Sequence, residues 1–162
     1  MISIPAPLNG LLQMLGHEFP SGNEDRIVEY ARLWQQYGGE VTALAREAGA
    51  AAGYARATND GPAMQAFGGN WSALDGVDVV ATKLGVAGNV VAACLMMIAG
   101  VTTGLKITEI TNVSVLQAHI VQAQAAAPAT FGASLSTIAP AQQITRQVID
   151  QAIRIAVESL RG

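Results

Sequence analysis

Residue types that perform catalysis or bind metals are few and scattered in this sequence. The two histidines, His17 and His119, lie about a hundred residues apart, and neither has a Cys, Asp or Glu at ligand spacing. Cys94 lies in an apolar run and is expected to be a small buried hydrophobe. No serine or cysteine stands in a nucleophile motif, and no glycine run follows a strand to cradle phosphate. We therefore predict a non-enzymatic chain with no cofactor and no metal site.

The composition indicates an all-α protein. Apolar residues make up 51% of the 162 residues, and they recur at helical spacing nearly everywhere instead of alternating as in strands. A chain of this length suits a single domain, residues 1–162. The net charge is −3, and the nine Lys and Arg residues form no stripe along which phosphates would bind. Nucleic-acid binding is therefore not expected.

The apolar pattern divides the chain into four parts. They are an N-terminal segment over 1–22, a heptad helix over 24–58, a second hairpin arm and apolar helix over 61–127, and a closing amphipathic helix over 140–161. A break or bend is expected near Gly100–Gly104, and Pro128 is expected to end the long helix. Together these parts predict an elongated helical bundle built from antiparallel helical hairpins.

The first long helix carries the clearest pattern. Apolar residues alternate at spacings of three and four, as in a coiled-coil seam. The first six are Ile27, Tyr30, Trp34, Tyr37, Val41 and Leu44. We expect all six to be buried against another helix. The closing helix has only a narrow polar strip, so we expect it to be wedged into a groove.

The stretch 84–105 contains no charged residue and supports two readings. At helical rise it would span ~33 Å, close to the thickness of a bilayer core. Alanine, glycine and Asn89 dilute its hydrophobicity and no aromatic belt flanks it, so a buried central helix is favoured. The alternative is a membrane-active helical protein that inserts residues 84–105, for instance as part of a channel.

The start of the sequence lacks the pattern of a Sec signal. The first basic residue is Arg26, so the positively charged start of such a signal is missing. If the protein is made in the cytoplasm and then secreted or placed in the cell envelope, we expect a Sec-independent route.

Several short motifs, in order, resemble a WXG-like domain of the kind found at the N-termini of actinobacterial polymorphic toxins and channel-type exported proteins. The motifs are Phe19–Asp25, a helix with Trp34, Ala66-Phe67 with Trp71, Ala129–Ser134 and the region of Ile138 and Pro140. The resemblance implies export by a type VII (ESX) system, a fold like two helical hairpins in one chain, and a helical-hairpin WXG-type partner or the secretion machinery as binding partner. It also implies a C-terminal effector domain on the full protein.

The sequence departs from the family pattern in two ways. Trp71-Ser72-Ala73 lacks the glycine of a strict Trp-x-Gly turn. No tyrosine has an acid four residues later, so a partner chain would have to supply the usual tail signal. We predict Phe67, Trp71 and Trp34 as the partner-binding or signature residues, with the recognised surface centred on Phe67 and Trp71. The neutral reading of all three rings is that they fill the core.

Overall fold

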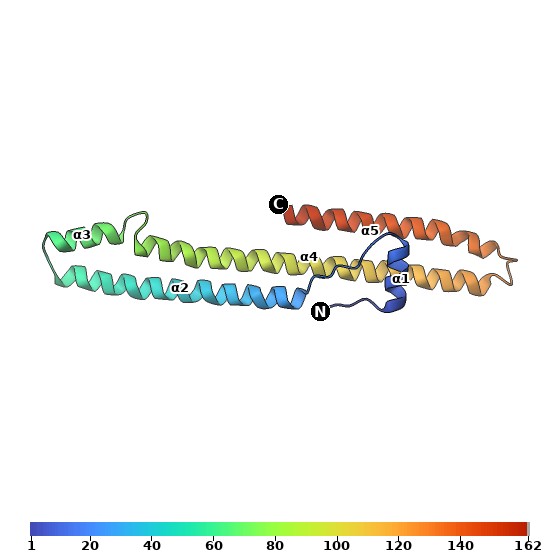
Figure 1. Cartoon of the computed structure of the whole chain (residues 1–162), viewed down its shortest axis with the longest axis horizontal. Coiled ribbons are helices and arrows are strands. Elements are labelled where there is room, and N and C mark those ends of the chain that lie inside the picture. The colour runs from blue at the N-terminus through green and yellow to red at the C-terminus, as the bar shows by residue number, and fades with distance from the viewer. Residues whose placement is uncertain (162) are drawn as a thin grey trace. The chain divides into compact units, whose positions relative to one another are not determined.

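The chain folds entirely into helices over the residues that the structure describes, 1–161. In the computed structural model the order is α1 (Ala6–Met14), α2 (Glu24–Thr58), α3 (Pro62–Trp71), α4 (Val77–Ala126), a 3-10 turn η1 (Ala133–Thr137) and α5 (Ile138–Arg161). Figure 1 shows these elements and the antiparallel pairing of the long helices. The predicted all-α helical bundle is confirmed. The predicted helices over 24–58 and 140–161 correspond to α2 and α5.

The contacts divide the chain into two compact units. The first contains residues 1–25 and 97–162, and the second contains Arg26–Met96. Helix α4 contributes residues to both units. The assignment of residues 1–162 to a single domain, made from the length of the chain, stays a prediction.

In the second unit, α2 and the first part of α4 pack antiparallel with their backbones in close contact. A Cβ atom built on Gly38 would lie 2.8 Å from the carbonyl oxygen of Gly85 and 3.1 Å from the amide nitrogen of Asn89. One built on Gly88 would lie 3.0 Å from the Cα atom of Gly38. Side chains larger than hydrogen do not fit at such distances, so glycine at these positions sets how closely the two helices approach.

This close contact corrects the predicted heptad seam. After the buried Glu24 of the first turn, the buried residues of α2 at heptad spacing are Ala31, Gly38 and Ala52, and all three are small. The predicted burial of Tyr30, Trp34, Tyr37 and Leu44 is wrong, because all four are exposed. Ile27 and Val41 are half-buried. The helix is rotated so that its small residues meet α4, since large rings would hold the backbones apart.

The first unit has the main apolar core. Figure 1 shows α5 running beside the second part of α4 and α1 crossing it. Leucines of α1 pack there against both longer helices. The buried cluster is Leu8, Leu12, Leu15, Val113, Leu116 and Ile149. This core holds the short α1 in place, because an isolated nine-residue helix is not stable in water.

A buried ion pair joins the N-terminal segment to α4. The ammonium of Lys106 is fully buried and donates to Glu24 Oε2 at 2.7 Å and to the Gly22 carbonyl oxygen at 2.5 Å. It also donates to the Ile2 carbonyl oxygen at 3.3 Å and lies 5.6 Å from the centre of the Phe19 ring. The Lys106 bond, with backbone N–H groups, lowers the pKa of Glu24 to about 2. A buried lysine with this many partners fixes the loop before α2 in one position.

A second buried carboxylate lies one turn further along α4. Glu109 is almost fully buried, and its Oε2 atom has no hydrogen-bond partner in the described structure. Burial raises its pKa to about 7, because the charged form loses its hydration there. Glu109 is therefore largely protonated below neutral pH.

Four further expectations from the sequence are wrong. Helix α4 continues through Gly100 and Gly104, so the break that was one of the two expectations there is absent. Cys94 is exposed. Helix α5 is not wedged into a groove, because it has one fully buried residue, Ile149, and several exposed apolar ones. The most apolar part of α4 is only 22% buried, so the stretch is not a buried central helix.

Replacing Gly38 by alanine should destabilise the second unit, because the added methyl group meets backbone atoms of α4 that cannot move aside. We expect a loss of about 1–3 kcal/mol in the free energy of unfolding, measured in urea. Gly39→Ala is the matched control: its Cβ has nothing within 4 Å, so the better helix propensity of alanine should add up to about 1 kcal/mol. Equal effects of the two substitutions would contradict the close backbone contact.

Glu109→Gln should remove one pH dependence of stability. The pKa of Glu109 is raised on folding, so this group lowers stability increasingly as pH rises from about 4.5 to about 7. The largest effect is about 3 kcal/mol. We expect the variant to melt at higher temperature than the wild type at pH 8 and at a similar temperature at pH 4.5. Glu24 has a lowered pKa, so its stabilisation is lost only as pH falls from about 4.5 towards 2, outside this window. Parallel melting curves at all pH values would contradict a buried, protonated Glu109.

Candidate functional site

Four large side chains of α2 form an exposed apolar surface, which we call the aromatic face: Tyr30, Leu33, Trp34 and Tyr37. Trp34 is 42% exposed and Tyr37 is 40% exposed. Their rings meet edge to face, with centroids 5.7 Å apart and planes at 88°. The four residues line a shallow hollow of about 290 Å³. A contiguous apolar surface of this kind is typical of protein-binding sites.

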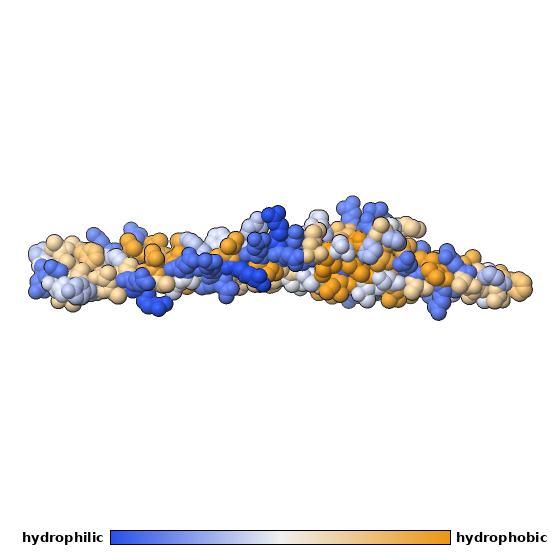
Figure 2. Space-filling view, turned by 90° about the horizontal axis from the view of Figure 1, so that it is seen from below, coloured by the Kyte–Doolittle hydropathy of each residue, from blue (hydrophilic) through white to orange (hydrophobic). Residues whose placement is uncertain are grey.

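The apolar surface continues along the second unit towards the start of α4. Leu44 is exposed on α2 and Val77 is exposed on α4, and both line a second, smaller hollow of about 130 Å³. The other lining residues are Val41, Ala45, Ala48, Asp78 and Ala81. Figure 2 shows hydrophobic side chains, in orange, at the surface among hydrophilic ones. A helix lying along α2 would cover both hollows.

The predicted pair Phe67 and Trp71 lies on α3. The two ring centroids are 5.7 Å apart, so the residues share one face of the helix as their spacing indicates. Phe67 is 37% exposed and Trp71 is half-buried. α3 has no fully buried residue, so these rings do not fill a core. A polar hollow beside α3 is lined by Arg56, Asp60 and Gln65 among others.

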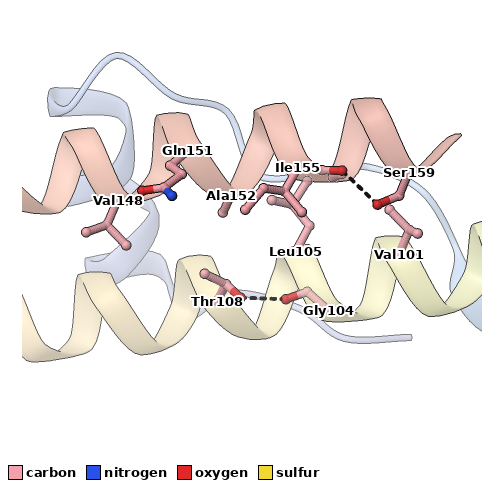
Figure 3. A pocket seen from close by; sticks show the side chains of 10 residues that line it. Val101, Gly104, Leu105, Thr108, Val148, Gln151, Ala152, Ile155 and Ser159 are labelled. Carbon is pink, nitrogen blue, oxygen red and sulfur yellow. Dashed lines mark hydrogen bonds between the residues drawn. The ribbon is translucent and has the colours of Figure 1, made fainter. Parts of the chain in front are cut away.

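The first unit has an apolar groove between α4 and α5 (Figure 3). Its volume is about 410 Å³, and the residues facing it are mostly small or aliphatic. They are Val101, Gly104, Leu105, Thr108, Val148, Gln151, Ala152, Ile155, Ala156 and Ser159. The hydroxyls of Thr108 and Ser159 donate to backbone carbonyls of their own helices, at Gly104 and Ile155. These hydroxyls are therefore engaged with the backbone of their own helices, and the groove is suited to binding apolar side chains.

The motif Ala129–Ser134 forms the turn between α4 and α5. The Ser134 hydroxyl donates to the Ala123 carbonyl oxygen, and the Thr130 hydroxyl donates to that of Ala126. Phe131 is fully exposed and has a positive φ of 49°. Hydrogen bonds thus fix the turn in a conformation that leaves the phenylalanine ring outside.

Groups of metal-ligating side chains are absent among residues 1–161. No group of three His, Cys, Asp or Glu residues is close enough to hold a metal ion there. His17 lies 3.6 Å from Asp150, and His119 contacts the Thr137 hydroxyl at 3.1 Å. What the described surfaces offer is binding of apolar side chains, chiefly on α2 and α3.

Helix α4 is also long and apolar enough to cross a membrane, by length and composition. It is the one such helix among the described residues. In the structure, the first part of α4 packs closely against α2 at Gly85 and Gly88.

Trp34 and the pair Phe67 and Trp71 lie in the same unit, and their role as partner-binding residues stays a prediction. Tyr30, Leu33 and Tyr37 were not predicted as surface residues. Tyr30 and Tyr37 were assigned to the buried seam, and Leu33 was given no role. The signal was available: Ala31, Gly38, Ala45 and Ala52 repeat every seven residues and form a smoother surface for close packing.

A comparison with protein families gave one match. The model of the WXG100 like domain matches residues 3–148, which is most of the chain. No curated protein and no solved structure matched.

The exposure of Trp34 can be measured by fluorescence. The chain has two tryptophans, so Trp71→Phe leaves Trp34 as the only emitter, and Trp34→Phe leaves Trp71. We expect acrylamide to quench Trp34 efficiently, and more strongly than Trp71, which is less exposed. Stronger quenching of Trp71 would mean that Trp34 lies in the seam after all.

Proposed function

Since the chain belongs to the WXG100-like family of helical proteins associated with type VII secretion, we propose that it is a non-enzymatic export and partner-docking domain of a type VII (ESX) secretion substrate. WXG100-like proteins are secreted by type VII systems, and the family is one of non-enzymatic secretion substrates. The observation that carries the proposal is the aromatic face, where four large apolar side chains remain exposed on a long helix.

The docking partner is a helical hairpin of the WXG type or a component of the secretion machinery. A second helical hairpin would bury the aromatic face and complete a bundle, because helix-on-helix packing is the general way to cover an apolar stripe. Exposed aromatic residues are the usual anchors of such interfaces, each worth ~2 kcal/mol or more. In the full protein, an effector domain following this one would be carried along in export.

Phe67 and Trp71 are the proposed recognition residues for export. Their ring centroids lie 5.7 Å apart on α3 with the ring planes tilted by 36°, and no residue of α3 is fully buried. A Cβ built on Gly69 would have nothing within 4 Å, whereas one on Gly68 would lie 3.3 Å from Nε of Arg56. A partner or machinery component that covers these rings would recognise the folded domain and not a linear leader sequence.

Membrane insertion of residues 84–105 is the second candidate function. The composition and low burial of α4 favour it. It requires α4 to leave α2, however, and so to give up the contacts of Gly85 and Gly88 with Gly38. A disulfide or chemical cross-link between α2 and α4 that leaves vesicle leakage unchanged would rule this candidate out.

Phe67→Ala combined with Trp71→Ala should reduce secretion from the native host at least about tenfold, because two anchor side chains are lost. Melting temperature should change little, since neither residue is fully buried. Leu74→Ala is the matched control: Leu74 is 86% exposed, lies close in sequence and belongs to neither surface. Normal secretion of the folded double variant would overturn the role of this pair.

A further inference from the structure

A row of carboxylates borders the aromatic face on the side away from α4. Glu29, Glu40 and Glu47 are separated by eleven and seven residues, so at 3.6 residues per turn they lie within about 20° of one another around α2. All three are exposed. Gln36 lies on the same side and donates its amide to Glu40 Oε1 at 2.7 Å. We call this row the acidic edge.

The acidic edge adjoins the apolar surface along its length. Glu29 is four residues from Leu33, Glu40 is three from Tyr37, and Glu47 is three from Leu44. Residues at these spacings are neighbours on a helix surface. Any helix that covers the aromatic face therefore has one edge close to these three carboxylates.

Arg26 lies three residues before Glu29, beside the first carboxylate of the acidic edge. The basic residues of α2 between residues 29 and 47 are Arg32 and Arg46. Arg32 and Arg46 are turned by roughly 60–120° from the acidic edge, away from the aromatic face. Lys83 lies on α4, roughly 140–160° around that helix from Gly85 and Gly88, which contact α2, so it is on the side away from α2. From Glu29 to Glu47, the border of the face on α2 thus carries carboxylates and no basic side chain.

We propose that the partner on the aromatic face is a helical hairpin with a row of Lys or Arg at the edge that meets Glu29, Glu40 and Glu47. This inference rests on the proposed docking function and names the chemistry of its partner. Opposite charges at the rim of an apolar interface select the partner and its register, as flanking charges do in coiled coils. A second copy of this chain, packed α2 against α2 in antiparallel orientation, would bring two acidic edges together and is disfavoured.

The chain itself supplies the probe. The variant E29K/E40K/E47K keeps the aromatic face and reverses its border, so it presents a basic edge to wild-type chain. The three residues are exposed, and circular dichroism should show an unchanged fold. Wild type, variant and a one-to-one mixture are compared by analytical ultracentrifugation at low and high salt.

We expect the mixture to associate at least about tenfold more tightly than wild type alone, from three rim charge pairs of ordinary strength. High salt should remove the difference, and Trp34→Ala in both chains should remove the association. The control D60K/D75K/E158K makes the same change in net charge at exposed sites off the aromatic face, and should not pair with wild type. Should E29K/E40K/E47K not fold, the neutral variant E29Q/E40Q/E47Q takes its place. Because it lacks the repulsion between two acidic edges, it should self-associate more tightly than the wild type.

Three results would overturn the inference: equal pairing by the control, self-association of wild type as tight as in the mixture, or no association of the mixture at about 0.1 mM. Secretion from the native host separates this failure from failure of the docking function. If E29K/E40K/E47K is secreted normally and Trp34→Ala is not, the docking function is supported and the selection by charge is contradicted. If both variants are secreted normally, the aromatic face has no role in export, and both the docking function and the selection by charge are contradicted.

Discussion

The close contact of α2 with α4 determines most of the surface of the second unit. Gly38, Gly85 and Gly88 bring the two backbones together at distances that exclude a Cβ atom. Once the small side of α2 faces α4, its aromatic residues turn outward. The dense backbone packing that holds the pair together and the exposure of a binding surface therefore have one cause. Without it, Trp34 and Tyr37 would be core residues and the chain would have no aromatic face.

The first unit is held by a different kind of interaction. Its apolar core is small, and a buried lysine joins the N-terminal segment, the loop before α2 and α4. Burial of a charge costs several kcal/mol unless partners replace its hydration, and Lys106 has a carboxylate and two carbonyl oxygens. Such a cluster specifies a single arrangement of the segments that supply the partners. Glu109, without a partner for one oxygen, avoids the cost of a buried charge below neutral pH, where it is largely protonated.

Both units leave apolar side chains uncovered, and this is consistent with a protein that completes its packing with another chain. The aromatic face, the rings of α3 and the groove between α4 and α5 are all on helices, and no metal-binding cluster occurs among the described residues. The docking function proposed above would account for such surfaces in a chain of the WXG100-like family, whose members are type VII secretion substrates. The acidic edge would then determine which helix is accepted.

Periodicity and composition predicted the helical fold, the extents of α2 and α5, the end of α4 before Pro128 and the pairing of Phe67 with Trp71. These follow from local constraints: the 3.6-residue repeat, the missing N–H of proline and the spacing of four. Two rows of α2 could form the buried side, one of aromatic and one of small residues, and hydrophobicity alone favours the aromatic row. The small row is buried instead because α4 approaches closely, and Gly85 and Gly88 of α4 allow that approach. The pair Glu24 and Lys106 was equally hidden, since 82 residues separate its members and only the tertiary fold brings them within 2.7 Å.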